Sequence, residues 1–394
     1  MEGSAGTHHR LSATRREGER VTPLELFFDL VFVLAITQCT ALMSHDQTWS
    51  GLAQGLLILG VLWWAWVGYS WLTSVIDPEA GAVRIVIFAA MAAMLIVSLC
   101  VQEAFDNLAL TFALAIGVFR AAHIALFWLA GADDKDLRRS VIGLAVSTAI
   151  GVAVLVLASF FDGLAQGALW ALAIFLDMAG PYFFGADGWK IVPGHFAERH
   201  GLIVIIALGE SIVAVGVGAS GALDLGIGTA AVLGIFLAAA LWWTYFDVVA
   251  LISARRLGEA EVGRTQNELA RDSYSYVHLL MVAGIVLIAY GMKVTIGHHS
   301  EELHDVPAFA LLGGLAIYLL GLVAFRYRQV QTVNRRRLGL AIVLLFLIPV
   351  ATAMPSLISL ALTVVSMWVL IVVEHRKYGS RRDELRREAS AAHT

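Results

Sequence analysis

Residues 24–43 read LELFFDLVFVLAITQCTALM, and this stretch decides the fold class. It holds only two charged side chains, Glu25 and Asp29. A helix of about 20 residues spans the ~30 Å hydrocarbon layer of a bilayer. The whole chain shares this character, since 59% of its 394 residues are hydrophobic and 15% are charged, against about 25% charged residues in a soluble domain. The sequence therefore predicts an all-α, polytopic membrane protein whose main partner is the lipid bilayer.

Further segments are also long and apolar enough to cross a membrane, which predicts about twelve transmembrane helices in all. They fall near residues 52–74, 84–102, 108–130, 140–160, 165–184, 201–219, 227–252, 275–296, 306–327, 337–353 and 356–374. The predicted organisation is two six-helix bundles, 23–184 and 201–374, joined by a cytoplasmic linker at 185–200. A flexible cytoplasmic tail, 1–22, precedes them, and a basic cytoplasmic tail, 375–394, follows.

The distribution of Lys and Arg predicts the orientation, because loops rich in these residues stay in the cytoplasm. Basic residues occur in both tails and in every second loop, and the intervening loops have none. Those of the alternate loops are Arg84; Lys135, Arg138 and Arg139; Lys190 and Arg199; Arg255, Arg256, Arg264 and Arg271; and Arg326, Arg328, Arg335, Arg336 and Arg337. We therefore expect both termini, and the loop at 253–273, to be cytoplasmic.

Short stretches in the second six spans are similar to stretches in the first six, in the same order. Residues 62–64 and 241–243 both read LWW, and residues 112–117 (FALAIG) match residues 309–314 (FALLGG). Glu25 opens the first span much as Glu198 opens the seventh, which makes Thr37 and Glu210 equivalent positions. Because six is an even number, the two units would have the same orientation, and parallel pseudo-repeats are predicted.

Glu210 is the clearest ionisable residue inside a predicted span. It lies near the middle of the seventh span, between Gly209 and Ser211. A charged side chain at such a depth costs about 2.5–3.5 kcal/mol, and intramembrane acids often mark ion pathways. Glu210 is therefore a candidate proton or cation site. The alternative is a buried carboxyl that a partner helix satisfies.

Arg120 is equally exceptional, at the middle of the fourth span. Its guanidinium keeps its proton, so it must meet a carboxylate or line a wet cavity. The candidate partners are the acids predicted inside spans, namely Asp29, Asp177, Glu210 and Asp247. His123, three residues further along the same helix face, is a candidate proton relay. A structural ion pair that ties helices together is the alternative.

Glu25 has a local explanation. Thr22, Pro23 and Glu25 fit the N-cap, N1 and N3 positions of a capping box at the start of the first span. Asp29 lies one turn deeper and is not explained by capping. Asp177 lies four residues before a proline, which frees a backbone carbonyl and favours a kink.

The acids predicted at depth outnumber Arg120, their one expected cation. Such an excess of carboxylates cannot all be ionised in a dry site, so we expect protonated acids, a bound cation or a water-filled cavity. Asp247 is the shallowest of them, in the cytoplasmic third of its span. The pattern favours the handling of protons or metal cations. The sequence has no zinc motif, phosphate-binding glycine loop, nucleophile elbow or basic arm, so no cofactor, enzyme activity or nucleic-acid partner is predicted.

Two motifs resemble the signatures of one family. Residues 22–32 (TPLELFFDLVF) are similar to the N-terminal signature of the bacterial low temperature requirement protein A family. Residues 198–202 (ERHGL) and 208–211 (LGES) are similar to its second signature, in which Glu198 and His200 mark the entry of the seventh helix. The resemblance covers about residues 20–374 and implies a multi-pass protein of the bacterial inner (plasma) membrane. The family's name records a growth phenotype and implies no mechanism.

A weaker similarity concerns the first span. Residues 28–32 (FDLVF) with 35–37 (AIT) are similar to the Phe-Ser-Asp motif in the first helix of the endolysosomal potassium-channel family, which is also built from six-helix repeats. Here Phe28 stands in place of the Ser, and Leu202 stands where the second repeat would have the Asp. Pore-lining roles therefore do not carry over to this chain.

Three functions are compatible with the sequence. The first is a proton- or cation-coupled secondary transporter of an unidentified small solute or ion, with two bundles that rock about a midplane site near Glu210 and Arg120. The second is a cation channel whose pore is lined by the first helices. The third is a non-transporting membrane scaffold or sensor. A homo-oligomer is compatible with each of them.

Overall fold

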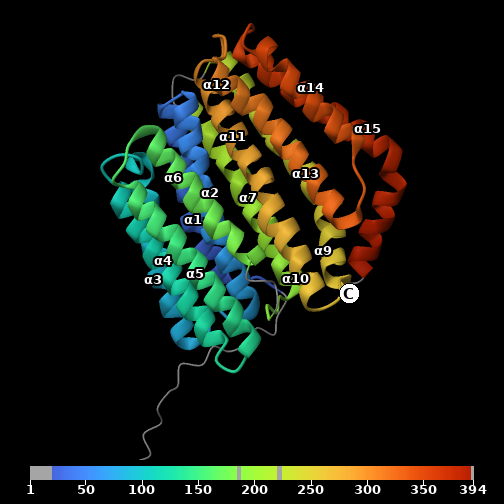
Figure 1. Ribbon diagram of the computed structural model, residues 1–394. Coiled ribbons are helices and arrows are strands. Elements are labelled where there is room, and N and C mark those ends of the chain that lie inside the picture. The colour runs from blue at the N-terminus through green and yellow to red at the C-terminus, as the bar shows by residue number, and fades with distance from the viewer. Residues whose placement is uncertain (1–19, 184–187, 220–223, 392–394) are drawn as a thin grey trace, which may run out of the picture.

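Helices account for nearly all of the regular structure in the chain (Figure 1). The structure is a computed structural model that describes residues 20–183, 188–219 and 224–391, with side chains up to residue 377. Within these ranges there is no β-strand, and Glu302 and Pro355 form an isolated β-bridge. The predicted all-α architecture is confirmed.

The first bundle consists of six long helices. They are α1 (Pro23–His45), α2 (Trp49–Val75), α3 (Gly81–Cys100), α4 (Ala109–Ala130), α5 (Lys135–Ala158) and α6 (Gly163–Phe183), with a 3₁₀ turn at Val101–Glu103. The start of α1 is the predicted capping box. Thr22 Oγ1 accepts a hydrogen bond from the backbone N–H of Glu25, and the Glu25 carboxylate accepts one from the backbone N–H of Thr22 at 2.9 Å.

The second bundle is less regular than the first. Its helices are α7 (Pro193–Gly218), α8 (Leu225–Phe246), α9 (Val249–Glu259), α10 (Arg264–Ala270), α11 (His278–Gly297), α12 (Asp305–Ala308), α13 (Gly314–Val330), α14 (Arg335–Ala351) and α15 (Ser356–Ala391). A π-helical segment, Arg271–Val277, joins α10 to α11, and another, Phe309–Gly313, joins α12 to α13. Each of these two joined helices crosses the bundle as a single span.

The number of spans agrees with the prediction of about twelve. In the described residues, 11 helices are long and apolar enough to cross a membrane. The remaining long helix, α14, has 17 residues, which corresponds to about 26 Å at a rise of 1.5 Å per residue. Many large apolar side chains point away from the bundle, such as Phe160 at 70% exposed and Phe346 at 79%. Lipid is the solvent in which such a surface is stable.

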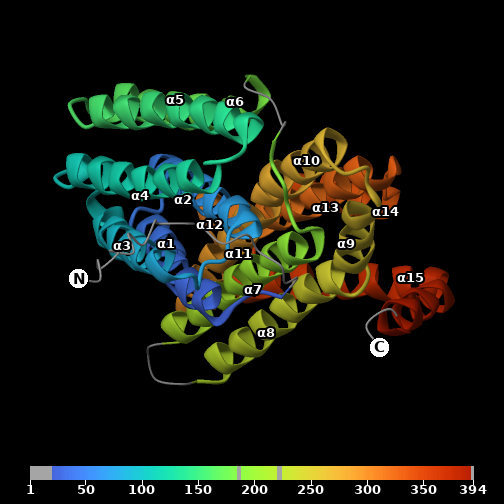
Figure 2. The ribbon, with the colours of Figure 1, turned by 90° about the horizontal axis from the view of Figure 1, so that it is seen from below.

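The centre of the molecule is formed by α1, α2, α7, α11 and α13. In Figure 2 these helices lie between the α5–α6 pair on one side and α8 with α15 on the other. The spans that contain α2, α11 and α13 are the most buried, and α6 is the least buried. The ionisable residues discussed below therefore lie in the protein interior and not on its lipid-facing surface.

Successive spans alternate in direction, so the basic connections gather at one end of the bundle. This end, where α1 and α7 begin, is called the basic end below, and it is the lower end in Figure 1. Asp134 caps α5 there, and Lys190 Nζ lies 2.7 Å from its Oδ2. This ammonium group holds the pKa of the Asp134 carboxyl below its ordinary value. The pair ties the connection that follows α6 to the start of α5.

The order of packing is similar in the two sets of helices. α1 packs against α2 and α3 as α7 packs against α8 and α11. α3 packs against α4 as α11 packs against α13, and α4 packs against α5 as α13 packs against α14. In the same way, α2 packs against α6 and α8 packs against α15. This order agrees with the predicted pseudo-repeats. The duplication itself stays a prediction.

Two predicted boundaries are wrong because helices begin earlier than expected. The segment 185–200, predicted as a linker, is helical from Pro193 onward. α14 begins at Arg335, two residues before the predicted span. As a result, Arg199 and Arg337, both counted as loop residues, are 0% and 6% exposed within the bundle. Arg120 is therefore one of three arginines that are buried among the described residues.

Candidate functional site

Three groups of buried or partly buried polar side chains contain Glu25, Asp29, Arg120, Asp177 and Glu210 among the predicted site residues. Two of them join α1 to α7, one near the basic end and one further along the same helices. The third joins α2, α4, α5 and α6. A buried charge is costly unless it is paired and hydrogen-bonded. The partners of each group therefore indicate what chemistry it can support.

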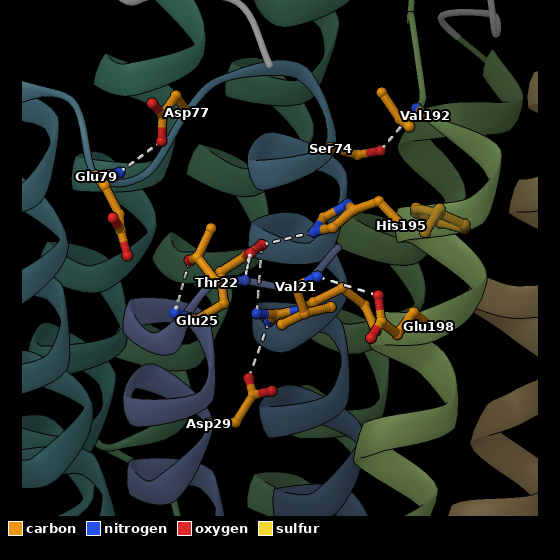
Figure 3. A network of polar contacts seen from close by, with 12 residues as sticks. Val21, Thr22, Glu25, Asp29, Ser74, Asp77, Glu79, Val192, His195 and Glu198 are labelled. Atoms are coloured by element: carbon orange, nitrogen blue, oxygen red, sulfur yellow. Dashed lines mark hydrogen bonds and ion pairs between the residues drawn. The ribbon is translucent and has the colours of Figure 1, made fainter. Parts of the chain in front are cut away.

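The first group, called the entry cluster, consists of Glu25, Asp29, His195 and Arg199 (Figure 3). Arg199 Nη2 lies 2.9 Å from Asp29 Oδ1, and Arg199 Nη1 lies 3.6 Å from Glu25 Oε1. His195 Nε2 lies 2.9 Å from the same Glu25 oxygen. All four side chains are at most 1% exposed. Glu25 therefore caps its own helix and also binds α7.

A tryptophan from α2 completes the entry cluster. Trp66 Nε1 donates a hydrogen bond of 3.0 Å to Asp29 Oδ1, and the Arg199 guanidinium lies 5.5 Å from the centre of the Trp66 ring. Two carboxylates here face one arginine and one histidine. The cluster is electrically neutral only when His195 or one of the two carboxyl groups carries an extra proton. Its most direct role is to hold the first two turns of α1 and α7 to the C-terminal half of α2.

Arg199 is a buried residue that the sequence analysis missed as part of a site. Two signals could have located it. Pro193 is typical of the first turn of a helix, and His195 and Arg199 are one turn apart on one helix face. Extending the seventh helix back to Pro193 would have placed both side chains opposite Glu25 and Asp29.

The two predicted entry residues of α7, Glu198 and His200, lie in different surroundings. Glu198 is exposed and accepts a hydrogen bond of 3.0 Å from the backbone N–H of Val21. His200 is fully buried, with its Nδ1 2.8 Å from the carbonyl of Phe196. Its ring packs against the side chains of Trp66 and His278, with centroids 5.0 and 5.4 Å away. Glu198 thus anchors the segment before α1, and His200 lies in the aromatic core.

The second group, called the hydroxyl cluster, consists of Thr37, Thr40 and Glu210. Thr37 Oγ1 and Thr40 Oγ1 each lie 2.5 Å from a different carboxylate oxygen of Glu210. Each hydroxyl also has a second acceptor within α1: the carbonyl of Val33 at 3.0 Å for Thr37, and the carbonyl of Thr37 at 2.9 Å for Thr40. Thr37 and Glu210, aligned as equivalent positions, are in direct contact.

The hydroxyl cluster can accommodate Glu210 in both of its protonation states. When Glu210 is ionised, both threonine hydroxyls can donate to it. When it is protonated, each hydroxyl can turn to its carbonyl acceptor, and the carboxyl O–H can donate to a threonine oxygen. No hydroxyl in the cluster is left without an acceptor in either state. The geometry therefore fits a group that gains and loses a proton.

Along α7, Glu210 lies closer to the far end than to the basic end, and its depth in the bilayer stays a prediction. Glu210 lies 17 residues after Pro193 and 8 residues before Gly218. At 1.5 Å per residue, this places it about 26 Å from the basic end of α7 and about 12 Å from the other end. The prediction assumed that α7 begins near residue 201. Glu210 therefore lies in the half of the bundle away from the basic end.

The third group is the ion pair of Arg120 and Asp177. Arg120 Nη2 lies 3.0 Å from Asp177 Oδ1 and 2.6 Å from Thr148 Oγ1, and Thr148 Oγ1 lies 2.8 Å from the same Asp177 oxygen. Arg120 Nη1 donates to the carbonyl of Trp64 at 3.4 Å. The predicted contact of Arg120 with an intramembrane acid is confirmed. The hydrogen bonds of Arg120 and Glu210 have no partner in common, and the expectation that the two residues share one site stays a prediction.

Two pockets meet at this ion pair, and both are lined by Trp64 and Arg120. The smaller, of about 20 Å³, extends away from the basic end, toward Gly60 and Leu155. The larger, of about 60 Å³, extends toward the basic end, where Trp189 and Arg271 line it. A single water needs roughly 10–15 Å³ of such space, so these volumes hold about one and about four waters.

His123 lines the larger pocket together with Arg120. Its side chain is fully buried, and the backbone of Gly68 is a hydrogen-bond partner for one of its two ring nitrogens. The Arg120 Nε is without a partner among the described residues. The predicted juxtaposition of Arg120 and His123 is confirmed, whereas the role of His123 as a proton relay stays a prediction.

Asp247 belongs to none of the three groups. It is buried at the C-terminal end of α8, where its backbone N–H donates to the carbonyl of Trp243 at 3.1 Å. A further ion pair, which the sequence analysis did not predict, joins α14 to α15. Arg337 donates to both carboxylate oxygens of Glu374, at 3.0 and 2.9 Å. This bidentate pair also fastens the last two helices to α8, because Arg337 Nη1 donates to the carbonyl of Thr244 at 3.3 Å.

Comparisons with known proteins agree with the two sequence motifs. The family described as bacterial low temperature requirement A protein matches residues 20–372. A protein of Rhizobium meliloti (strain 1021), described as uncharacterized, is 27% identical over 401 residues, which cover 95% of each chain. No solved structure matches the chain. The chain belongs to the bacterial low temperature requirement A protein family.

Proposed function

We propose that the protein is a secondary transporter of a small solute or ion, coupled to protons, in the inner (plasma) membrane. The observation that carries the proposal is the position of the Arg120–Asp177 pair between two pockets, one toward each end of the bundle. Alternating access requires a site that can be reached from one side and then from the other. A charged pair at the junction of two pockets is suited to be that site.

The hydroxyl cluster supports the coupling part of the proposal. Glu210 is held between α1 and α7, which belong to different bundles. Protonation of Glu210 would redirect the hydroxyls of Thr37 and Thr40 to carbonyls within α1. The two helices would then share one hydrogen bond where they had shared two charge-assisted ones. A proton would in this way weaken the contact between the bundles and favour their relative movement.

The test is proton-coupled uptake by the purified protein in liposomes that contain a pH-sensitive dye. Solutes and ions are screened against an imposed pH gradient, and Glu210→Gln is compared with wild type. Gln keeps the shape and one acceptor for a threonine hydroxyl but cannot exchange a proton, so we expect an unchanged melting temperature and loss of coupled uptake. The control is Glu103→Gln, which alters an exposed acid outside the hydroxyl cluster.

The same preparation separates the alternatives. Normal coupled uptake by a well-folded Glu210→Gln protein would overturn the proposed role of Glu210. Ion flux that follows its own gradient without proton movement would indicate the cation channel. No flux of any solute in the panel, together with full thermal stability, would favour the scaffold.

A further inference from the structure

The larger pocket, on the basic-end side of Arg120, has a charge and a shape that select a ligand. Its lining residues include Arg120 and Arg271, and none of them carries a carboxylate. Its walls are largely aromatic, formed by Trp64, Trp71, Phe127 and Trp189. Pockets of this kind take an apolar body by burial and fix its orientation with a few polar groups.

The carboxylates that pair with the arginines of this pocket do not fully neutralise the positive charge of the arginines. Asp177 pairs with Arg120, and Asp272 is shared by Arg271 and Arg328 at 2.8 and 3.0 Å. Three guanidinium groups therefore face two carboxylates, which leaves one net positive charge. Arg328 is about one third exposed and partly hydrated, whereas Arg120 is only 3% exposed. A monovalent anion in the pocket, which Arg120 and Arg271 both line, would complete this balance.

Unused hydrogen-bond donors point to the position of such an anion. The Nε of Arg120 is buried without a hydrogen-bond partner among the described residues, and His123 beside it has only the backbone of Gly68 as a partner for its two ring nitrogens. An unsatisfied buried polar group costs about 1–3 kcal/mol. A carboxylate can accept from the guanidinium and from an imidazole N–H at the same time, and it would satisfy both residues.

Gly68 has no side chain, which leaves room beside it for His123 and Arg120. A Cβ added to Gly68 of α2 would lie 2.6 Å from His123 Cε1 and 2.8 Å from Arg120 Nη1. The wall toward the second bundle is the π-helical segment Arg271–Val277, in which Ser275 Oγ accepts a hydrogen bond of 2.9 Å from Trp71 Nε1. π-helical segments are frequent at functional sites.

We propose that this pocket binds a short-chain monocarboxylate, with its carboxylate between Arg120 and His123 and its alkyl tail against the aromatic walls. The inference rests on the proposed transport function, for which it names the substrate class. The volume of about 60 Å³ limits the tail to a few carbons. A halide of the same charge would leave the aromatic walls unused, and an amine would bring a second cation to Arg120.

The experiment is equilibrium binding to the purified protein in detergent, read by the fluorescence of the lining tryptophans and by calorimetry. The probes are propionate, propanol, propylammonium and chloride. We expect propionate to bind at least about tenfold more tightly than the other three, because it alone satisfies both the charge and the walls. Equal binding of propanol, propylammonium or chloride, or no binding of propionate, would overturn the inference.

Two variants test the location of the site. Gly68→Ala places a methyl group between His123 and Arg120, and His123→Phe keeps a ring of similar size without its nitrogens. Each is expected to weaken propionate binding about tenfold or more. His123→Phe should do so at an unchanged melting temperature, whereas the added methyl group of Gly68→Ala also displaces packed side chains and should lower the melting temperature. The matched controls are Gly167→Ala, where an added Cβ meets no atom within 4 Å, and the exposed His45→Phe. Wild-type propionate affinity in both test variants would overturn the assignment.

Binding and transport can fail independently. If propionate binds but no solute is taken up with protons, the proposed function fails and the binding site stands. If another solute shows coupled uptake and propionate does not bind, the substrate class fails and the proposed function stands.

Discussion

Arg120 and Asp177 come from α4 and α6, and neither side chain could be buried alone without a large cost. The same holds for Arg199 with Asp29 and for Arg337 with Glu374. Each pair has an N–O distance of 2.9–3.0 Å and joins two helices. An ion pair of this kind adds little net stability over apolar packing, but breaking it leaves an uncompensated charge. At the scale of single residues, these pairs determine which helices are neighbours.

Replacing one member of the buried pair should therefore cost far more than replacing both. We expect Arg120→Leu to lower the free energy of unfolding by about 3–5 kcal/mol, and the double variant Arg120→Leu/Asp177→Leu to be close to wild type. Denaturation of the purified protein, followed by tryptophan fluorescence, measures both.

The control is Arg264→Leu, which removes an exposed pair with Glu268. We expect a loss of at most about 1 kcal/mol there. A double variant as unstable as the single variant would mean that Arg120 is needed for its packing and not for its charge.

At the scale of elements, close contact between α11 and α13 depends on small residues that face each other. A Cβ added to Gly284 of α11 would lie 2.7 Å from the carbonyl oxygen of Gly314 and 2.7 Å from the backbone nitrogen of Tyr318. Both are backbone atoms, which cannot turn aside as a side chain can. Small residues let membrane helices approach until their backbones touch, and dispersion forces then hold them.

Gly284→Ala should push α11 and α13 apart. We expect a destabilisation of about 1–3 kcal/mol from overpacking, seen as a lower melting temperature. Gly339→Ala in α14 is the matched control, because an added Cβ there meets no atom within 4 Å. Alanine is the better helix former by up to about 1 kcal/mol, so this control should be neutral or slightly stabilising. Equal melting temperatures for the two variants would contradict the close contact.

At the scale of the whole molecule, the basic connections lie at one end of the bundle. Because cytoplasmic loops carry the excess of Lys and Arg, we propose that this end faces the cytoplasm. Glu210 then lies nearer the outer surface, and the larger pocket opens toward the cytoplasm. This orientation assigns a side of the membrane to each of the two proposed sites, Glu210 and the larger pocket.

Single-cysteine labelling checks the orientation. In a background without Cys39 and Cys100, Val262→Cys lies in the connection between α9 and α10, and Asp162→Cys lies in the connection between α5 and α6. Both positions are exposed. An impermeant thiol reagent added to intact cells should label Asp162→Cys and spare Val262→Cys until the cells are opened. Labelling of Val262→Cys in intact cells would reverse the proposed orientation.

The sequence by itself determined the helical fold, the number of spans to within one, and the capping box at Thr22 and Glu25. These features depend on residues that are neighbours in the chain. The length of an apolar run decides whether it can span a bilayer, and a cap is made within one turn. The need of Arg120 for a carboxylate was also predictable, because the cost of an unpaired guanidinium does not depend on the fold.

Only the tertiary structure decided which acid Arg120 meets, that Arg199 is buried opposite Asp29, and that Glu210 is held by Thr37 and Thr40. These partners are separated by 57, 170 and at least 170 residues along the chain. Every span is apolar, so hydrophobicity alone does not specify which helix packs against which. That choice depends on the fit of whole helix faces and on the pairing of a few buried charges, and both exist only once the helices are assembled.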